Sequence, residues 1–277
     1  MRKLIRSLYR NIPVALFSTL LAFAPSGCQT TTEPITGRPQ FILTDPAQEA
    51  RMGLQAWQDI QKEEKLSDSP AHAAAVERVG TALSKAIDEK DFEWEFKTFK
   101  SDQANAFCLP GGKVGVYDGL FEYLENDAEL AAVVGHEIGH AVARHGGERM
   151  TQGLLQNLGA LGLSVALKDA TEVQQVRWMA AYAGLTTVGV ILPYSRTHEY
   201  AADQLGVMYM ARAGYDPHAA LSFWEKFAKQ SKTPGILEFL STHPVGENRI
   251  QRLKQILPRA MIEYEMAPVR RGLGKSY

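Results

Sequence analysis

The sequence predicts a mainly helical α+β fold with a small antiparallel sheet, and three patterns support this prediction. Helix-capping residues open a helical stretch at Asp45. Residues 92–99 alternate aromatic and polar side chains for most of their length, as a half-buried strand does. From Asp127 onward, apolar residues recur every three or four positions, as on one face of a helix. The chain has 277 residues, of which 45% are hydrophobic, so it is long enough for one enzyme-sized domain.

The first predicted elements are two helices. Asp45 is suited to cap a helix, Pro46 fits its first position, and Gln48 stands where a capping box needs Glu or Gln. These signals predict a helix from Pro46 to about residue 66. A second helix is expected from Pro70 to about residue 89.

The predicted sheet follows these helices. FEWEFKTF, residues 92–99, is expected to form one strand, and residues 105–119 form two short extended pieces around Pro110-Gly111-Gly112. Proline has no backbone N–H to donate to a neighbouring strand, so Pro110 favours an edge position. A small hairpin-like sheet is the expected result.

Helices are expected to dominate the rest of the chain. Residues 153–193 contain two apolar, Gly-rich patches, and neither reaches the approximately 20 residues that cross a bilayer. We therefore expect buried helices or a mobile lid there rather than a membrane insertion. Further helices are predicted around residues 198–213, 217–230 and 248–256, with a loop at residues 241–248.

The N-terminus has the shape of a signal peptide, because basic residues precede a short apolar run over residues 12–24. Ser26-Gly27-Cys28 resembles the end of a bacterial lipobox, although Pro25 departs from that pattern. We expect lipidation of Cys28; simple cleavage and a retained N-terminal anchor are the alternatives. The predicted organisation is a signal peptide over residues 1–27, a tether over 28–44, a single folded domain over 45–258 and a tail over 259–277.

Charge and cysteine content exclude several classes of protein. The formal net charge is −1, from 30 basic and 31 acidic residues, so the overall charge does not favour nucleic-acid binding. Cys28 and Cys108 are the two cysteines, and lipidation of Cys28 would leave Cys108 without a partner. No disulfide framework is expected. Cys108 is predicted to be a buried, inert thiol rather than a redox switch.

The most specific chemical signal is His136-Glu137-Ile138-Gly139-His140, an HExxH motif on a predicted helix. At about 100° per residue, the two imidazoles lie within about 40° of each other, one turn apart. Both can therefore reach one metal ion, and Glu137 can act as general base on a water there. A buried helix that merely carries histidines is the alternative, but burying these polar groups without a partner would be costly.

His145 and the pair Glu199 and Asp203 are the other candidate ligands in the sequence. His145 lies about 900° beyond His136 on a continuing helix, so we expect it to point away from the metal in a capping or surface role. Glu199 and Asp203 lie four residues apart in an otherwise apolar helix. They are either a solvated face or, as we propose, a metal ligand and the acceptor that orients a ligand histidine.

Four motifs in order resemble the gluzincin family that contains the CAAX prenyl endopeptidases and the HtpX protease, peptidase family M48. These are NAFCLPGG at 105–112, the HExxH helix at 126–145, EYAAD at 199–203 and STHPVGENRI at 241–250. The resemblance is greatest to periplasmic lipoprotein members of the LoiP and BepA type, and we expect no tetratricopeptide module. It implies a zincin fold whose small antiparallel sheet lies beside the active-site helix.

The resemblance also implies roles for residues. It implies a zinc endopeptidase with one Zn²⁺ per chain, held by His136, His140 and Glu199, with Glu137 as base and Asp203 behind the ligands. His243 would face the metal, either stabilising the oxyanion or filling the open position in a resting state. An edge strand would bind extended substrate, through Asn105, Ala106 and Phe107. Arg249 is expected to order the His243 loop or to have a plain surface or capping role.

The predicted function is hydrolysis of misfolded or misassembled cell-envelope proteins. The predicted location is the periplasmic face of the outer membrane, with a soluble periplasmic protein as the alternative. A largely latent zincin that acts as a chaperone-like adaptor in outer-membrane protein assembly is the main rival function. An integral-membrane peptidase is a third reading, and the short apolar patches disfavour it.

Overall fold

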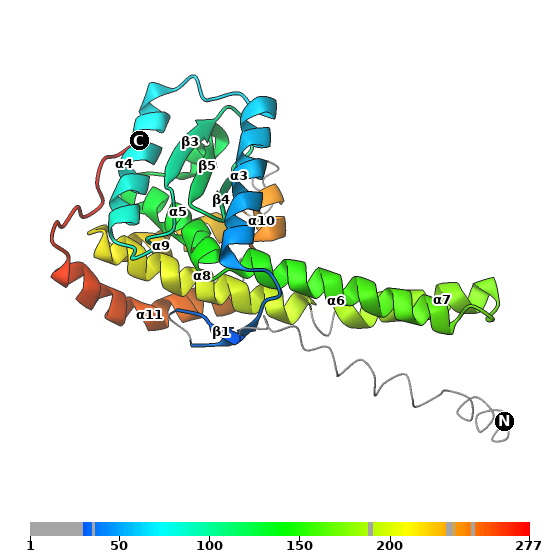
Figure 1. Cartoon of the computed structure of the whole chain (residues 1–277). Coiled ribbons are helices and arrows are strands. Elements are labelled where there is room, and N and C mark those ends of the chain that lie inside the picture. Colours follow the sequence, from blue (N-terminus) through cyan, green and yellow to red (C-terminus); the bar gives the residue numbers. More distant parts are fainter. Residues whose placement is uncertain (1–29, 35–36, 188–190, 231–234, 236, 245–246) are drawn as a thin grey trace.

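A computed structural model of the chain describes residues 30–34, 37–187, 191–230, 235, 237–244 and 247–277 (Figure 1). The predicted signal peptide and the predicted lipidation site Cys28 lie outside these residues. Within them, the fold is mainly helical with two small sheets, which confirms the predicted class.

The elements follow the predicted order. The strands are β1 (Thr30–Thr32), β2 (Pro39–Phe41), β3 (Glu95–Phe99), β4 (Ala106–Leu109) and β5 (Lys113–Tyr117), and a 3₁₀ helix, η2, spans Asp118–Tyr123. The helices are α3 (Pro46–Glu63), α4 (Pro70–Lys85), α5 (Asp127–Val142), α6 (His145–Ala166), α7 (Glu172–Thr186), α8 (Leu192–Arg212), α9 (His218–Lys229), α10 (Leu237–Thr242) and α11 (Glu247–Met266).

The central sheet is mixed, whereas the sequence predicted an antiparallel one. Its strand order is β3-β5-β4, with β4 antiparallel and β3 parallel to β5. The predicted hairpin is correct for β4 and β5, whose turn contains Gly111 and Gly112 at φ values of 85° and 88°. Residues 100–105 carry the chain from β3 to the far side of β5, and this crossover makes β3 parallel to β5.

Helix α5 lies at the centre of the molecule, and each of its residues is buried. The sheet packs against it on one side and α8 on the other (Figure 1). Glycines bring the backbones of α5 and α8 together: a Cβ added at Gly206 would lie 2.7 Å from the His136 nitrogen. The two helices that carry the HExxH and EYAAD motifs are therefore in direct backbone contact.

Helices α6 and α7 form a hairpin that projects from the body of the molecule (Figure 1). The prediction of buried helices here was wrong, because Leu158, Leu161, Val176 and Trp178 are between 54% and 64% exposed. Apolar composition predicts burial only where another element lies close enough to pack on it. Among the described helices, none combines the length and apolar character needed to cross a bilayer.

The predicted tail and the described residues of the predicted tether, 30–34 and 37–44, are ordered parts of the fold. Strands β1 and β2 pair as a small antiparallel hairpin within the segment expected to be a tether. At the other end, α11 continues to Met266, past the boundary predicted at residue 258. The last residues then lie against the start of α5, where the Tyr277 hydroxyl donates to Asp127 Oδ1 at 2.9 Å. Neither connection has a local sequence signal.

Candidate active site

Helix α5 holds the HExxH motif in the interior. Its start is fixed by Asn126, whose side chain accepts a hydrogen bond from the Glu129 N–H. His136, Glu137 and His140 are at most 7% exposed. The Nε2 atoms of His136 and His140 lie 3.1 Å apart, as expected for residues one helical turn apart.

Helix α8 brings Glu199 to the two histidines. Its Oε2 lies 3.3 Å from His136 Nε2, and its Oε1 lies 3.2 Å from His140 Nε2. Burial alone would raise the pKa of Glu199, but hydrogen bonds from His136, His140 and His243 hold it far below its usual range. The carboxylate is therefore ionised and directed at both imidazoles.

His243, which directly follows α10, completes the cluster. Its Nδ1 lies 3.2 Å from His136 Nε2 and 3.1 Å from Glu199 Oε2. One ligand atom from each of His136, His140, Glu199 and His243 lies within 4.8 Å of the others. The structure thus brings together every residue predicted to hold or face the metal.

The donor set fits a cation. His136 Nδ1 lies 2.9 Å from Asp203 and Nε2 lies 3.3 Å from Glu199, and carboxylates only accept, so without a metal ion both ring nitrogens donate and His136 carries a proton on Nε2 that a metal ion would displace. Burial and Arg249 lower the pKa of His136, yet hydrogen bonds to Asp203 and Glu199 raise it to about 9. Burial, together with the nearby His136 and His145, lowers the pKa of His140. The cluster therefore favours one positive charge, which a metal ion would supply on displacing the proton.

Asp203 and Arg249 support the ligands from behind. Arg249 Nε and Nη2 donate to the two oxygens of Asp203 at 2.6 and 2.7 Å, and both residues are buried. Burial raises the pKa of Asp203, but the charge of Arg249 and the contact with His136 outweigh it and lower that pKa. Arg249 thus has neither a surface nor a capping role. It supplies the charge that keeps Asp203 ionised.

Glu137 lies beside the cluster and is not one of its four members. Its Oε1 is buried, has no hydrogen-bond partner among the described residues and lies 3.5 Å from His243 Nε2 in an ion-pair contact. An unpaired buried carboxylate oxygen is costly unless a water or substrate fills its place. This is the position expected of a general base.

The sequence predicted a capping or surface role for His145, but its side chain is fully buried and lies against His140. Its Nδ1 lies 2.9 Å from His140 Nδ1. The prediction assumed a continuing helix, whereas α5 ends at Val142 and Arg144 takes a left-handed conformation with φ 53°. This turn redirects the chain and places His145 beneath His140. A non-glycine residue at positive φ is uncommon, so the sequence did not signal the turn.

The predicted substrate-binding residues lie at the expected edge. Ala106 and Phe107 belong to β4, which pairs with β5 on one side. Among the described residues, no strand pairs with its other side. Strand β4 also packs against α5, the helix that holds the HExxH motif. Asn105 precedes this strand, and its carbonyl accepts from the Tyr117 N–H at 2.9 Å.

Cys108 lies on the same strand and is half-buried. Burial, with a smaller contribution from Glu137, raises the pKa of its thiol well above the usual range. The thiol is therefore protonated at neutral pH. A protonated thiol matches the predicted inert role, because the thiolate is the reactive form.

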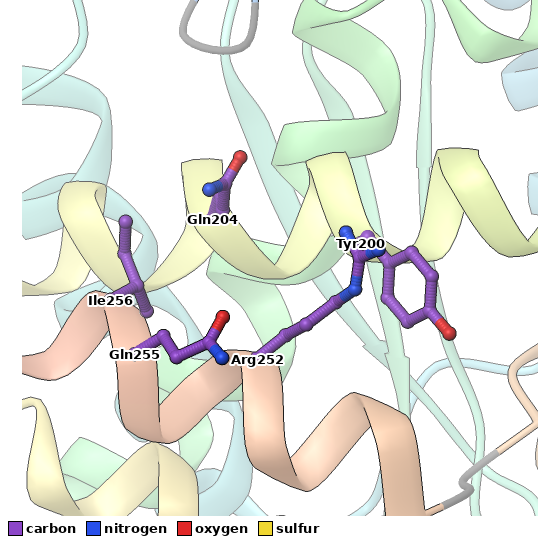
Figure 2. Close-up of a pocket in the computed structure, with 5 residues that line it drawn as sticks. All are labelled: Tyr200, Gln204, Arg252, Gln255 and Ile256. Carbon is purple, nitrogen blue, oxygen red and sulfur yellow. The ribbon is translucent and has the colours of Figure 1, made fainter.

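A separate hollow lies between α8 and α11, away from the ligand cluster (Figure 2). Arg252 of α11 reaches across it and lies 3.9 Å from the centre of the Tyr200 ring. Tyr200 follows Glu199, but successive helical residues point about 100° apart, so the two side chains face different sides of α8. This hollow does not belong to the candidate active site.

Sequence reasoning missed a second buried cluster beside the first. His145 and His198 stack with ring centres 4.1 Å apart, and Glu33, Arg38 and Glu148 contact them or each other. The composition of the segment around Glu33 resembles a linker, and its partners lie over 100 residues away. Only the tertiary structure reveals this cluster.

Comparison with known proteins identifies the family. Residues 70–257 match the model of peptidase family M48. The chain is 37% identical to the mitochondrial metalloendopeptidase OMA1 of Arabidopsis thaliana over 88% of its length, and 30% identical to OMA1 of Schizosaccharomyces pombe over 84%. It is 28% identical over 88% of its length to the beta-barrel assembly-enhancing protease of Escherichia coli K12.

These alignments cover 44% of the Arabidopsis protein, 68% of the fission yeast protein and 52% of the Escherichia coli protein. The chain therefore spans about half the length of two of these relatives. The matched region contains the HExxH helix, Glu199 and His243, so the site built above lies inside the family's domain. The chain belongs to peptidase family M48.

Proposed function

We propose that this protein is a zinc-dependent endopeptidase that hydrolyses misfolded or misassembled proteins of the bacterial cell envelope. One observation supports the catalytic part above all. His136, His140 and Glu199 converge on one point in the interior, and Glu137 lies beside that point with a buried oxygen that has no hydrogen-bond partner among the described residues. This arrangement combines a metal site with a general base.

The residues of the chain divide the chemistry between them. His136, His140 and Glu199 would hold the ion, and Zn²⁺ in such a site supplies a Lewis acid that polarises a carbonyl and acidifies water. Glu137 takes a proton from the attacking water as the water oxygen bonds to the peptide carbonyl carbon. It then delivers that proton to the amide nitrogen as the carbon–nitrogen bond breaks. Asp203 and Arg249 hold His136 in the orientation that this chemistry needs.

The open edge of β4 supports binding of an extended peptide. An unfolded chain would add to the sheet as a strand beside Asn105, Ala106 and Phe107 and be held chiefly through main-chain hydrogen bonds. Such binding requires a substrate segment that is not itself folded. This requirement agrees with misfolded proteins as the substrate class.

His243 supports a resting state in the described conformation. Because its Nδ1 contacts both His136 and Glu199, His243 occupies a fourth donor position in the cluster. We propose that His243 swings away when substrate binds and then stabilises the oxyanion. On this proposal, His243→Ala increases zinc accessibility to a small chelator while lowering the turnover of a bound peptide.

The cellular assignment rests on the N-terminal sequence and on a relative. We propose export by the signal peptide, lipidation at Cys28 and attachment to the periplasmic face of the outer membrane, with a soluble periplasmic protein as the alternative. The Escherichia coli relative is named for beta-barrel assembly, which supports a role in the envelope.

The position of His243 also favours a second candidate function. A site closed by a fourth donor would be mostly silent, and the protein would then act as a chaperone-like adaptor in outer-membrane protein assembly. Complementation of a deletion strain by Glu137→Gln separates the two. Full complementation supports the adaptor, and loss of complementation supports the enzyme.

Purified protein tests the proposed activity directly. Wild type and Glu137→Gln are loaded with zinc, assayed for metal content and incubated with an unfolded protein such as casein. We expect Glu137→Gln to bind one zinc per chain as wild type does and to lose at least about 100-fold in cleavage rate, because it cannot transfer the proton. Undiminished cleavage by this variant would contradict the assignment.

A further inference from the structure

A second buried cluster adjoins the metal-ligand cluster and touches it at one point. Its members Glu33, His145, Glu148 and His198 are at most 2% exposed. The contact point is the 2.9 Å approach of His145 Nδ1 to Nδ1 of the ligand His140. Glu33 lies in the segment that the sequence predicted to be a tether, 112 residues before His145. This segment therefore reaches the metal-ligand cluster through His145.

The distances fix the direction of the hydrogen bonds. His145 Nε2 lies 3.0 Å from Glu33 Oε1, and a carboxylate only accepts, so the proton is on Nε2. His140 turns its Nε2 toward Glu199 and His136, so a metal ion held there would take the Nε2 lone pair and leave the proton of His140 on Nδ1. His140 Nδ1 then donates to His145 Nδ1, which accepts because the His145 proton is on Nε2.

Arg149 is a weaker competitor for the same atom. Its Nη2 lies 3.4 Å from His140 Nδ1 and can only donate, so it would favour the opposite tautomer of His140. The contact between His145 Nδ1 and His140 Nδ1, at 2.9 Å, is shorter than the Arg149 contact at 3.4 Å. The shorter, better-formed contact decides the orientation of the ring.

We propose that Glu33 is a positioning residue for the metal ligand His140, acting through His145. The chain Glu33–His145–His140 does for His140 what Asp203 does for His136: it fixes the tautomer and the ring plane of a ligand. The β1–β2 hairpin is then part of the metal site. The inference rests on the proposed metal site but not on the proposed proteolysis.

The hairpin is held in place by the same cluster. Arg38 donates to Glu33 at 2.6 Å and to Glu148 at 2.5 Å, so one guanidinium bridges both carboxylates. Gln40 donates to the Ala143 carbonyl at 2.6 Å, in the turn that places His145 beneath His140. The hairpin therefore supplies the carboxylate and also fixes the turn that presents His145.

A second metal ion at this cluster is the rival explanation. His145, Glu148 and His198 have the donor chemistry for one, and their ligand atoms converge. However, the guanidinium of Arg38 already supplies a positive charge to the carboxylates of Glu33 and Glu148, and a divalent cation beside it would be repelled. We therefore expect one zinc per chain.

The test compares Glu33→Gln with a matched control, Glu49→Gln. Glu49 is also a buried carboxylate paired with an arginine, Arg144, in the same turn, but none of its hydrogen bonds is to a metal ligand. Zinc affinity is measured by competition with a chromophoric chelator, and the unfolding of each metal-free variant is measured alongside. We expect Glu33→Gln to bind zinc about 10–100-fold more weakly and Glu49→Gln to stay within about twofold of wild type.

Four outcomes would overturn the proposal. Equal zinc affinity of Glu33→Gln and wild type would show that Glu33 does not position His140, and an equal loss in both variants would reduce its role to general stability. Two zinc ions per chain in wild type would favour the rival site. If wild type binds no zinc, the proposed function fails as well, whereas absent proteolysis with normal zinc binding leaves this inference intact.

A measurement without substitutions covers the case in which Glu33→Gln does not fold. Histidine side-chain nitrogen–proton correlation spectra of zinc-loaded wild type report which nitrogen carries each proton. We expect His145 to be protonated at Nε2 and His140 at Nδ1. A His145 ring protonated at Nδ1 would contradict the proposed chain of hydrogen bonds.

Discussion

Charged residues that do not belong to the ligand cluster hold the ligand side chains of this site in place. Asp203 orients His136, and Arg249 in turn neutralises Asp203 from a fully interior position. The Arg249 guanidinium also lies 3.7 Å from the centre of the Trp224 ring, which covers its other face. A buried ion pair of this kind tolerates the loss of one partner poorly, because the remaining charge stays in the interior.

Arg249→Met tests this at the residue scale. The substitution keeps a long side chain but leaves Asp203 without its cation, so we expect a loss of about 3–5 kcal/mol in the free energy of unfolding. Urea unfolding of the metal-free protein measures it. Arg252→Met, on the exposed side of the same helix, is the control and should cost much less. Similar losses in both variants would mean that the pairing with Asp203 is unimportant.

At the scale of elements, the site depends on how closely α5 and α8 approach. Each helix carries part of the ligand set, and glycines at their contact remove the side chains that would hold them apart. His136 and His140 come from α5, whereas Glu199 and Asp203 come from α8. The distance between the helices therefore sets the distance between the ligands.

Gly206→Ala is predicted to disturb that distance. Its Cβ would lie 2.7 Å from the His136 nitrogen and 2.8 Å from the Gly135 carbonyl carbon, both of which are backbone atoms that cannot rotate away. We expect a loss of about 1–3 kcal/mol in stability and weaker zinc binding. Thermal unfolding and chelator competition measure the two effects.

Gly153→Ala is the matched control for this substitution. It lies within helix α6, and a Cβ there meets nothing within 4 Å. Alanine should stabilise the helix by up to about 1 kcal/mol, because glycine is the poorer helix former. A destabilising Gly153→Ala would show that glycine replacement alone, rather than the helix contact, causes the effect at Gly206.

At the scale of the whole molecule, both ends of the described chain fold back onto α5. Gln40 of the β1–β2 hairpin contacts the turn that follows the C-terminal end of α5. The last residues of the chain contact Asp127 at the start of α5. Asp127 also accepts from Arg78 of α4 at 2.6 and 2.9 Å. The active-site helix is therefore held by segments from four parts of the sequence: α4, α8 and the two ends.

The decrease in the free energy of unfolding at acid pH should depend on the ionisation of Asp127. Burial raises its pKa, but hydrogen bonds from Arg78, the Lys275 N–H and Tyr277 outweigh burial and lower it. A depressed pKa contributes stability that is fully present above the unfolded value of about 4 and is lost as pH falls through the folded value. Asp127→Asn should therefore cost about 1–3 kcal/mol at pH 7, with a deficit that shrinks below pH 4.

Unfolding of the metal-free protein at several pH values measures this deficit, and metal-free samples avoid the separate loss of zinc in acid. Asp59→Asn is the control, because the Asp59–Lys62 pair is exposed and should contribute little at either pH. A deficit for Asp127→Asn that is constant with pH would rule out ionisation as its cause.

Local patterns predicted what depends on local geometry. Helix caps, the alternation of residues 92–99 and the 3.6-residue period of α5 are properties of short segments, so the main helices and strands were predicted at nearly their observed places. The close pairing of His136 and His140 follows from helix geometry alone. Glu199 and Asp203 were proposed from their four-residue spacing in an apolar helix, and His243 was added through the family resemblance; the structure brings all three to the histidines.

Tertiary contacts decided the rest. The parallel β3, the exposed α6–α7 hairpin, the buried His145 and the ordered ends of the chain each depend on which distant segment lies alongside. Composition shows that a segment can be buried or flexible, but the presence of a partner determines which. By itself, the sequence determined the class of fold and the helix that carries the HExxH motif, and it predicted Glu137 as the base. Only the tertiary structure decided what holds the ligands, because Glu33 and Arg38 reach them from a segment with no local signal and Arg249 meets Asp203 across two separate helices.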